Sequence, residues 1–365
     1  MKSPLVRAKK LNKVVSILTE YFENNGYSEV QLPIYEFYDL LEGVTWDFKD
    51  ENIIRFIDRY TGKSLVLRPD FTPQACRFVS LYMKDYPLPI RISYKGRIFR
   101  NVDLNKGLKS EKYQVGCELF GLQEFLGDIE IIFLAYNSLK KIGLKNYKIV
   151  LGDSNLVNEI IKTFGNNRSV VKCLKEKNLD ELKKLYNEKS ISENEYVLLL
   201  AMIKGFGDKF VLDEVIEKSS FNDRLQQRLI YLKDLMENLI SIGVEEGDII
   251  FDATEMRGFN YYTGINFDII NSKGVVIGGG GRYDNLMEKF DWPLQSCGFA
   301  LNIEEILQDI DFLDNKQKFD YLVVGENYFF KALNLKNDGF KVLWIKDELE
   351  IENIMKLYDF EKIIK

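Results

Sequence analysis

The chain has 365 residues, 46% of them hydrophobic, which is enough for a sizeable core and for two or three domains. It contains no histidine, so imidazole cannot act as a general base or a metal ligand, and this excludes most hydrolase triads and zinc sites. The formal net charge of −6 argues against a long electrostatic footprint for nucleic acid.

The first part of the chain predicts an antiparallel sheet with flanking helices. Residues 8–25 carry apolar side chains at helical spacing up to Asn24, Asn25 and Gly26, which predicts an amphipathic helix. The order of helices and strands given in the next sentence fits an α+β fold better than regular βαβ repeats. After the first helix we expect, in chain order, a short helix past Pro33, strands over 53–58 and 64–67, a helix over 73–84, β-rich segments over 90–100 and 111–121, a helix over 126–141, a strand over 147–153 and a helix from about 154.

The character changes over residues 165–247, where charges are frequent and apolar residues recur at spacings of three and four with no convincing strand. We interpret this stretch as an inserted helical subdomain. Strand signals return over 248–254, 261–270 and 274–280, with helices near 283–290 and 303–309. From Phe319 onward two strands alternate with two short helices. The expected domains are a core over 1–164 and 248–312, an insertion over 165–247 and a small α/β appendage over 313–365.

Location and redox state are also bounded by the sequence. No apolar run approaches the roughly twenty residues of a membrane span, and the first seven residues lack the apolar stretch of a secretory signal, so we expect a cytoplasmic protein. The cysteines are far apart with no C-x-x-C pair, which indicates reduced and mostly buried thiols at Cys76, Cys117, Cys173 and Cys297.

A run of four glycines, from Gly278 to Gly281, stands before Arg282 and suggests close approach of a ligand to bare backbone. It lacks the Lys-Ser/Thr of a Walker loop and the G-x-G-x-x-G spacing of a dinucleotide site, so the run alone does not predict a nucleotide site. We expect Arg282 to pair with a carboxylate inside the fold, because Asp284 and other acids lie nearby.

Six segments, in this order and spacing, resemble the catalytic core of histidyl-tRNA synthetase, a class II aminoacyl-tRNA synthetase. The resemblance covers about residues 5–310. It implies an antiparallel active-site sheet with a histidine pocket beside an ATP pocket, a strand role for the glycine run, and a homodimer through the motif 1 region around Pro33. The segments are LRPDFTPQ (67–74), SYKGRIFRN (93–101), YQVGCELFG (113–121), RGFNYYTGINF (257–267), GGGGRYDNL (278–286) and GFALNIEEIL (298–307).

The resemblance implies a histidine site with no metal and no cofactor. Both signs of charge are needed close together to hold a zwitterion, and a selective site must hydrogen-bond both imidazole nitrogens. The alternative for any one of these residues is that it only satisfies another polar group or caps a strand. The implied roles are ammonium contacts from Asp70, Thr72 and Gln114, imidazole contacts from Glu118 and Tyr262, a carboxylate contact from Arg257 and walls from Tyr261 and Tyr283, with Arg100 retained from motif 2.

The ATP side of the implied site departs from the synthetase pattern. In motif 3, Asn302 stands in place of a glycine and Glu305 in place of the arginine that meets the γ-phosphate, which reverses the sign of the charge. The motif 2 loop has Leu108, Ser110 and Lys112 where synthetases have two arginines and an aromatic residue. Only residues 308–365 follow motif 3, in place of an anticodon-binding domain. We therefore expect neither adenylate formation nor tRNA recognition.

A histidine pocket without ATP chemistry resembles the regulatory-subunit family of ATP phosphoribosyltransferase. This resemblance implies a non-catalytic subunit in histidine biosynthesis, which assembles with a short catalytic subunit into a hetero-octamer, activates it and confers feedback inhibition by histidine. Two alternatives stay open: a divergent adenylating enzyme, and a stand-alone histidine-binding protein.

Overall fold

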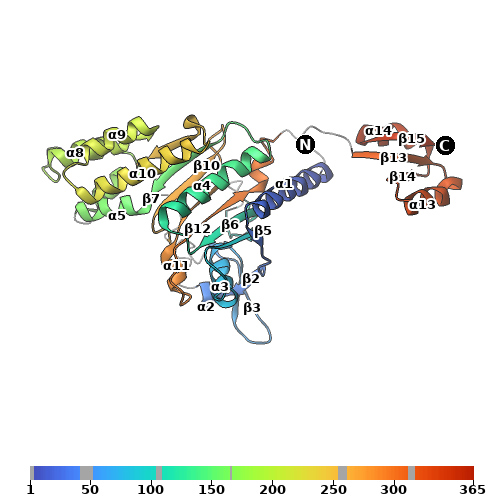
Figure 1. Cartoon of the computed structure of the whole chain (residues 1–365), viewed down its shortest axis with the longest axis horizontal. Helices are drawn as coiled ribbons and strands as arrows, with labels where there is room; N and C mark the ends of the chain where they lie inside the picture. Colours follow the sequence, from blue (N-terminus) through green and yellow to red (C-terminus); the bar gives the residue numbers. More distant parts are fainter. Residues whose placement is uncertain (1–3, 42–51, 104–108, 165–166, 254–260, 311–316) are drawn as a thin grey trace. The chain divides into compact units, whose positions relative to one another are not determined.

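A nine-stranded sheet organises the larger of two units, Met1–Ile310 and Asp311–Lys365, in this computed structural model (Figure 1). The structure describes residues 4–41, 52–103, 109–164, 167–253, 261–310 and 317–365. The strand order across the sheet is β1 (Ser28–Glu29), β5 (Ile90–Phe99), β6 (Glu111–Phe120), β12 (Ser296–Asn302), β11 (Val276–Arg282), β10 (Ile265–Ile270), β7 (Lys148–Asp153), β9 (Ile249–Asp252) and β8 (Phe206–Gly207).

The sheet is antiparallel except for two parallel pairs, β1 with β5 and β7 with β9. Long ladders join β5 to β6 and β6 to β12, so the motif segments that are far apart in the sequence become neighbours in space. The glycine run lies within β11, between β10 and β12. It is therefore a strand rather than a phosphate-binding loop, as the resemblance implied.

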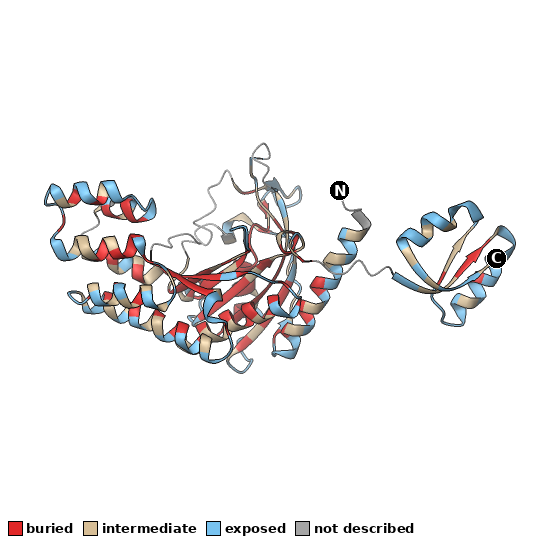
Figure 2. Cartoon of the chain, turned by 90° about the horizontal axis from the view of Figure 1, so that it is seen from above, coloured by how far each residue is buried: buried red, intermediate tan, exposed pale blue. Residues whose placement is uncertain are grey.

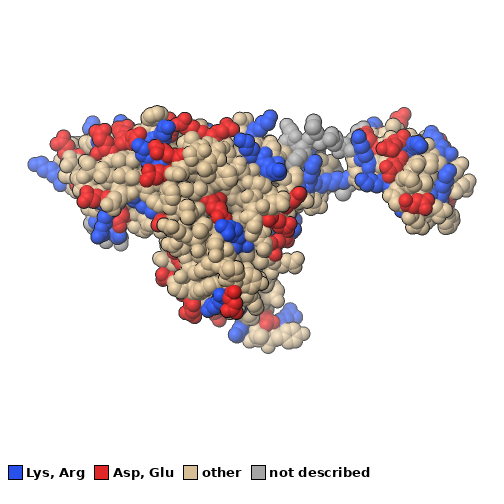
Figure 3. Space-filling view, in the orientation of Figure 1, with Lys and Arg blue, Asp and Glu red and all other residues tan. Residues whose placement is uncertain are grey.

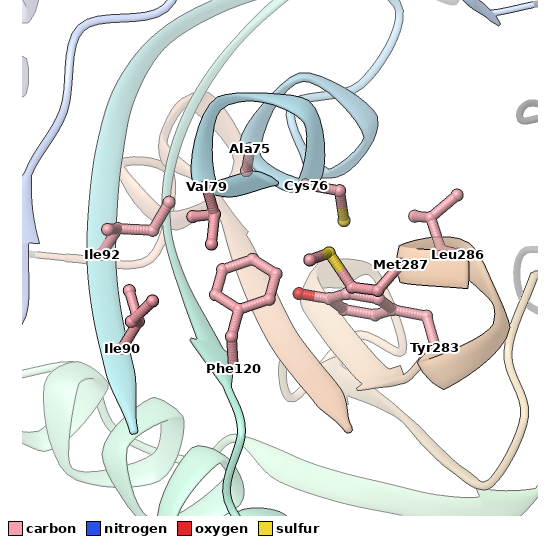
Figure 4. Packing of buried hydrophobic residues seen from close by; sticks show 9 residues of the cluster. All are labelled: Ala75, Cys76, Val79, Ile90, Ile92, Phe120, Tyr283, Leu286 and Met287. Atoms are coloured by element: carbon pink, nitrogen blue, oxygen red, sulfur yellow. The ribbon is translucent and has the colours of Figure 1, made fainter. Parts of the chain in front are cut away.

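Helices cover both faces of the sheet. On one face α1 (Pro4–Asn24) and α4 (Glu124–Lys141) pack together and against β6 and β12. On the other face α3 (Thr72–Tyr82) and α11 (Asp284–Glu288) enclose an apolar cluster with β5 and β6. Figure 4 shows the Tyr283 ring within this cluster, and Figure 2 shows the buried residues concentrated in the sheet.

Small elements complete the core. A second, three-stranded sheet has the order β2 (Tyr35–Phe37), β4 (Ser64–Leu67) and β3 (Arg55–Ile57), with α2 (Tyr38–Leu41) beside it. The short helix α12 (Ile303–Ile306) follows β12. Charged side chains of both signs are interspersed on the face of this unit shown in Figure 3. Within the described residues no helix is both long and apolar enough to cross a membrane.

The described residues between 154 and 248 form helices joined by short loops, with one short strand. Most of these helices have an N-cap residue whose side chain accepts a hydrogen bond from a backbone N–H of the first turn. Asn178, Asp208 and Asn222 are examples. The expectation of no strand here needs one correction, because the two-residue β8 pairs with β9 at the sheet edge. The elements are α5 (Ser154–Thr163), α6 (Arg168–Lys175), α7 (Leu179–Asn187), α8 (Glu193–Lys204), α9 (Lys209–Lys218), α10 (Asp223–Ser241) and η3 (Glu246–Asp248).

The smaller unit contains a parallel three-stranded sheet in the order β14, β13, β15. Its last strand, β15, was not expected from the sequence, because charges at Asp359, Glu361 and Lys362 interrupt its apolar pattern on an exposed edge. The elements are β13 (Gln317–Val324), η4 (Glu326–Tyr328), α13 (Phe329–Asn337), β14 (Val342–Ile345), η5 (Glu348–Glu350), α14 (Ile351–Leu357) and β15 (Tyr358–Ile364).

Candidate functional site

A cavity of about 230 Å³ lies over the face of the large sheet that is opposite to α1 and α4. Alternation along β6 puts Gln114, Gly116 and Glu118 on this face and the residues between them on the other, because side chains of a strand point to the two faces in turn. Of the residues assigned to histidine binding by resemblance, those that line the cavity are Asp70, Thr72, Arg100, Gln114, Tyr261, Tyr262 and Tyr283.

Glycines form the floor of this cavity. A Cβ atom on Gly280 would lie 2.2 Å from the carbonyl oxygen of Gly298, and one on Gly278 would lie 2.8 Å from that of Ala300. The close approach of β11 and β12 therefore requires residues without side chains. The arginine that ends β11 lies below the sheet and not in the cavity: Arg282 pairs with Asp128 and Asp284, which confirms the expected internal ion pair.

Glu118 lies just behind the cavity lining and is 1% exposed. Its Oε1 accepts hydrogen bonds from the hydroxyls of Thr72, at 2.8 Å, and Tyr94, at 3.2 Å, while its Oε2 accepts from the hydroxyl of Tyr283. Burial raises the pKa of the Glu118 carboxyl to about 8, against the opposing effect of these hydroxyl donors. The site therefore holds an acid that is protonated near neutral pH and is surrounded by hydroxyls.

A second acid lines the same cavity. Asp70 is 6% exposed, and its Oδ2 accepts a hydrogen bond of 2.9 Å from the hydroxyl of Tyr261. Arg100 is close by, with its Nε donating to the Pro69 carbonyl at 3.1 Å. Burial lowers the pKa of the Arg100 guanidinium, while the charge of Asp70 opposes this change. Both signs of charge are thus present beside a largely buried space.

Gln114 offers an acceptor that the protein leaves unused. Its Nε2 donates to Oδ1 of Asn302 at 3.0 Å, which fixes the amide. Its Oε1 is buried and has no hydrogen-bond partner within the described part of the chain. A buried acceptor of this kind costs about 1–3 kcal/mol when it stays unpaired, so it favours a ligand that carries N–H donors.

Three tyrosine rings form one wall of the cavity. The rings of Tyr261 and Tyr262 meet edge-on with centroids 5.1 Å apart, and those of Tyr261 and Tyr283 do so at 6.0 Å. Such edge-to-face pairs fix one another in place. The remaining assigned residue, Arg257, lies outside the described residues.

Tyr94 is a cavity residue that the sequence reasoning missed. It lines the cavity, donates to Glu118 and stacks on Phe71 with ring centroids 4.2 Å apart, while Arg68 lies 3.7 Å above the other face of Phe71. The signal that could have found it is Gly116, which pairs with Tyr94 across the ladder. A Cβ on Gly116 would lie 2.6 Å from the Tyr94 hydroxyl, so the glycine makes room for that ring.

The far end of the cavity carries the residues that replace the synthetase ATP pattern. Lys112 and Asn302 line this end. The carboxylate of Glu305 lies 3.9 Å from the ammonium groups of both Lys109 and Lys112. The acid therefore neutralises the two cations that would otherwise attract a polyphosphate here.

Comparison with known proteins identifies the family of this chain. The family model described as Histidyl-tRNA synthetase matches residues 5–306. An ATP phosphoribosyltransferase regulatory subunit from Geobacter sulfurreducens is 30% identical over 310 residues, which are 84% of this chain and 70% of that protein. One from Clostridium novyi is 33% identical over 335 residues, 88% of this chain and 78% of that protein.

Solved structures agree with these matches. A protein from Bacillus halodurans, described as an ATP phosphoribosyltransferase regulatory subunit/histidyl-tRNA synthetase, superposes with a TM-score of 0.82 at 25% identity, covering 98% of this chain and 94% of that one. Histidyl-tRNA synthetase from Nostoc shares the fold, with a TM-score of 0.73 at 16% identity, over 96% of this chain and 85% of that one. These matches confirm the predicted class II synthetase-like fold. The chain belongs to the family of ATP phosphoribosyltransferase regulatory subunits, which lies within the wider histidyl-tRNA synthetase family.

Proposed function

We propose that this chain is the non-catalytic regulatory subunit of a short-form ATP phosphoribosyltransferase in histidine biosynthesis. It binds histidine in the cavity described above, activates the catalytic subunit and confers feedback inhibition on it. By the same resemblance, the two subunits form a hetero-octamer. The observation that carries the proposal is the buried, unused oxygen of Gln114 beside Asp70, in a cavity backed by Glu118.

The cavity suits a small amino acid with an imidazole side chain. The α-ammonium would donate to Asp70, to the Gln114 oxygen and to the Thr72 hydroxyl, with charge-assisted hydrogen bonds to the acid. The imidazole would lie between Tyr262 and the hydroxyl-bound Glu118. A site with buried polar groups at both ring nitrogens rejects an isosteric apolar side chain, because those groups would then be left unpaired.

The charge pattern at the far end of the cavity supports a regulatory role over adenylation. Glu305 presents a negative charge where an adenylating relative needs a positive one, and it holds Lys109 and Lys112 in ion pairs. Exchange of pyrophosphate into ATP in the presence of histidine tests the alternative. A histidine-dependent exchange rate would establish an adenylating enzyme instead.

The decisive experiment measures phosphoribosyl transfer from phosphoribosyl pyrophosphate to ATP by the short catalytic subunit of the same organism, with and without this chain, across a histidine titration. We expect this chain to raise the rate and histidine then to suppress it. By linkage, the substrates of the catalytic subunit should weaken histidine binding by the factor by which histidine weakens theirs. An unchanged rate would remove the regulatory assignment and leave a stand-alone histidine-binding protein.

Calorimetric titration of histidine with the Glu118→Gln variant tests the pocket itself. We expect a loss of at least tenfold in affinity, because the amide cannot keep the three hydroxyl donors and also serve the imidazole. The matched control is Glu130→Gln, which alters a half-buried acid paired with Arg91. Equal affinities for both variants and the parent would place histidine elsewhere.

We also propose a homodimer through the motif 1 region. Tyr35 and Phe56 meet edge-on on the small sheet and are 52% and 40% exposed. Beside them, Gln74 donates to the Tyr35 carbonyl, and its own buried Oε1 has no partner among the residues described. Sedimentation of a Tyr35→Ser/Phe56→Ser variant should show a shift to monomer. The control is Phe330→Ser, which changes an aromatic residue that is 75% exposed in the smaller unit.

A further inference from the structure

A buried chain of polar contacts leads from the cavity wall to the insertion helix α10. It begins at Arg282, which is 1% exposed and precedes the cavity residue Tyr283 in the sequence. The Arg282 guanidinium donates from Nε to Oδ1 of Asp128 at 2.8 Å and also donates to the backbone carbonyl of Glu124 at 2.8 Å. Asp128 lies on α4 and is fully buried.

The chain continues from Asp128 into α10. The second oxygen of Asp128 accepts a hydrogen bond of 2.6 Å from the hydroxyl of Tyr231. The ring of Tyr231 packs edge-on against Phe125 of α4, and the guanidinium of Arg228 lies 4.1 Å above it. Arg228 in turn donates to the buried Asp153 at 2.8 Å. Helix α10 is therefore attached to the core by hydrogen bonds from the partly buried side chains of Tyr231 and Arg228 to two buried carboxylates.

The other end of this chain holds the cavity wall. The carbonyl of Arg282 accepts from the amide of Thr263 at 2.8 Å, and the side chain of Arg282 fills the space beside Gly264. Thr263 and Gly264 directly follow the wall tyrosines, and the hydroxyl of Thr263 accepts from the amide of Asp284. Tyr261 and Tyr262 thus lie within two residues of Thr263, which contacts Arg282, and Tyr283 directly follows Arg282 in the sequence.

We propose that the bridge of Arg282, Asp128 and Tyr231 couples the cavity to the helical insertion, so that occupancy of the cavity and docking of α10 on α4 stabilise each other. Arg282 and Asp128 are buried, and buried polar groups are stable only when they are paired, so a shift of the tyrosine wall that moves Arg282 is transmitted through Asp128 to Tyr231. Reciprocity requires that loosening α10 weaken the ligand by the same factor. The proposal deepens the proposed function and takes histidine as the ligand from it.

The test uses Tyr231→Phe, which removes only the hydroxyl and keeps the ring against Phe125. The matched control is Tyr136→Phe, which removes a hydroxyl that donates to Asp248 at 2.8 Å and accepts from the Glu245 amide at 3.4 Å, and which does not line the cavity. For the full chain and each variant, histidine affinity is measured by calorimetry. Hydrogen exchange of residues 225–239 and of the amides of Thr263 and Tyr283 is measured with and without histidine.

Coupling predicts that Tyr231→Phe binds histidine at least fivefold more weakly than the parent, and that histidine protects α10 in the parent but not in this variant. The control should keep both properties. Equal changes in the two variants, or none in either, would overturn the proposal. If the parent itself does not bind histidine, the proposed function is wrong. Hydrogen exchange measured without any ligand then tests the coupling between the cavity wall and α10 by itself. Thr263 and Tyr283 must then exchange faster in Tyr231→Phe than in the control, and equal rates would refute the bridge.

Discussion

Glu118 shows how one buried acid takes its properties from its neighbours. Three hydroxyl donors favour its charged form, whereas the surrounding apolar cluster and the nearby charge of Asp70 disfavour it. Burial is the largest of these effects, so the pKa of Glu118 rises to about 8. The proposed imidazole ligand would therefore meet an acid with a pKa close to neutral pH, in a chain that has no histidine of its own.

The raised pKa of Glu118 predicts a difference in pH dependence between the parent and Glu118→Gln. Between the usual Glu pKa of 4.5 and about 8, the unfolded chain is ionised at this residue while the folded chain keeps its proton. Stability from Glu118 is therefore fully present below about pH 4.5 and is lost as the pH rises towards 8, by up to about 1.4 kcal/mol per pH unit.

Urea unfolding at pH 5, 6, 7 and 8 measures this effect. The free energy of unfolding of the parent should fall relative to that of Glu118→Gln as the pH rises. Asp128, whose pKa burial raises to about 7, is present in both proteins and cancels in the difference. Parallel curves would show that Glu118 is ionised throughout this range.

Gly298 predicts a steric effect on the same acid. A Cβ at this position would lie 1.6 Å from Oε2 of Glu118, so Gly298→Ala must displace the carboxyl group. We expect a loss of about 1–3 kcal/mol of stability and at least tenfold weaker histidine binding, measured by urea unfolding and calorimetry. Gly247→Ala is the control, since an added Cβ there meets nothing within 4 Å. A Gly298→Ala protein with parental affinity would contradict the assigned position of the ligand.

At the scale of elements, the spacing of apolar residues and the residues that end helices were sufficient to predict most of the fold. The helices α1, α3, α4 and α5 and the strands β5, β6, β7, β9 and β10 of the main sheet appear close to their expected ranges, because each has a strong pattern of apolar residues. No strand was predicted for β1, β8 or β12 of the same sheet. The strand β15 was missed, since Met355 and Leu357 continue the helical spacing of α14 up to its start and no glycine or proline separates the two.

Only those residues of the candidate site that stand at a motif position of their own segment could be predicted from the sequence. Asp70 and Tyr283 were placed by their segments and line the cavity. Tyr94 was not, because its role depends on a contact with Gly116 across the ladder between two strands, and a single sequence does not specify that register. The bridge from Arg282 to Tyr231 could not be predicted for a similar reason: its members come from three separate elements, and a single sequence does not specify how these pack together.

A capping box at the start of α8 predicts a local effect in the insertion. The amide of Ser192 donates to the Glu195 side chain at 2.7 Å, and the Ser192 hydroxyl accepts from the Glu195 amide. Ser192→Ala should cost about 1 kcal/mol and speed hydrogen exchange in the first turn of α8 about fivefold, with histidine affinity unchanged. Ser190→Ala, at an exposed position before the helix, is the control. Slower or unchanged exchange in Ser192→Ala would show that the cap contributes nothing to α8.

At the scale of the whole molecule, all the described residues that line the cavity come from the larger unit. These lining residues run from Asp70 to Asn302 in the sequence, and the unit ends at Ile310. A chain of residues 1–310 should therefore bind histidine within about twofold of the affinity of the full chain, as measured by calorimetry, because the same polar groups surround the ligand. A large loss of affinity would assign the smaller unit a part in the site.

The absence of histidine from the chain also has a spectroscopic consequence for Glu118, the acid that accepts hydrogen bonds from three hydroxyl groups. Any imidazole resonance in a magnetic resonance spectrum of this protein must come from the ligand, because the chain contributes none. Histidine labelled with ¹⁵N in its ring would report its own tautomer and proton count next to Glu118, free of background, across the pH range in which that acid titrates. The protein would have to be purified without a polyhistidine tag, since the tag would introduce the signals that the natural sequence lacks.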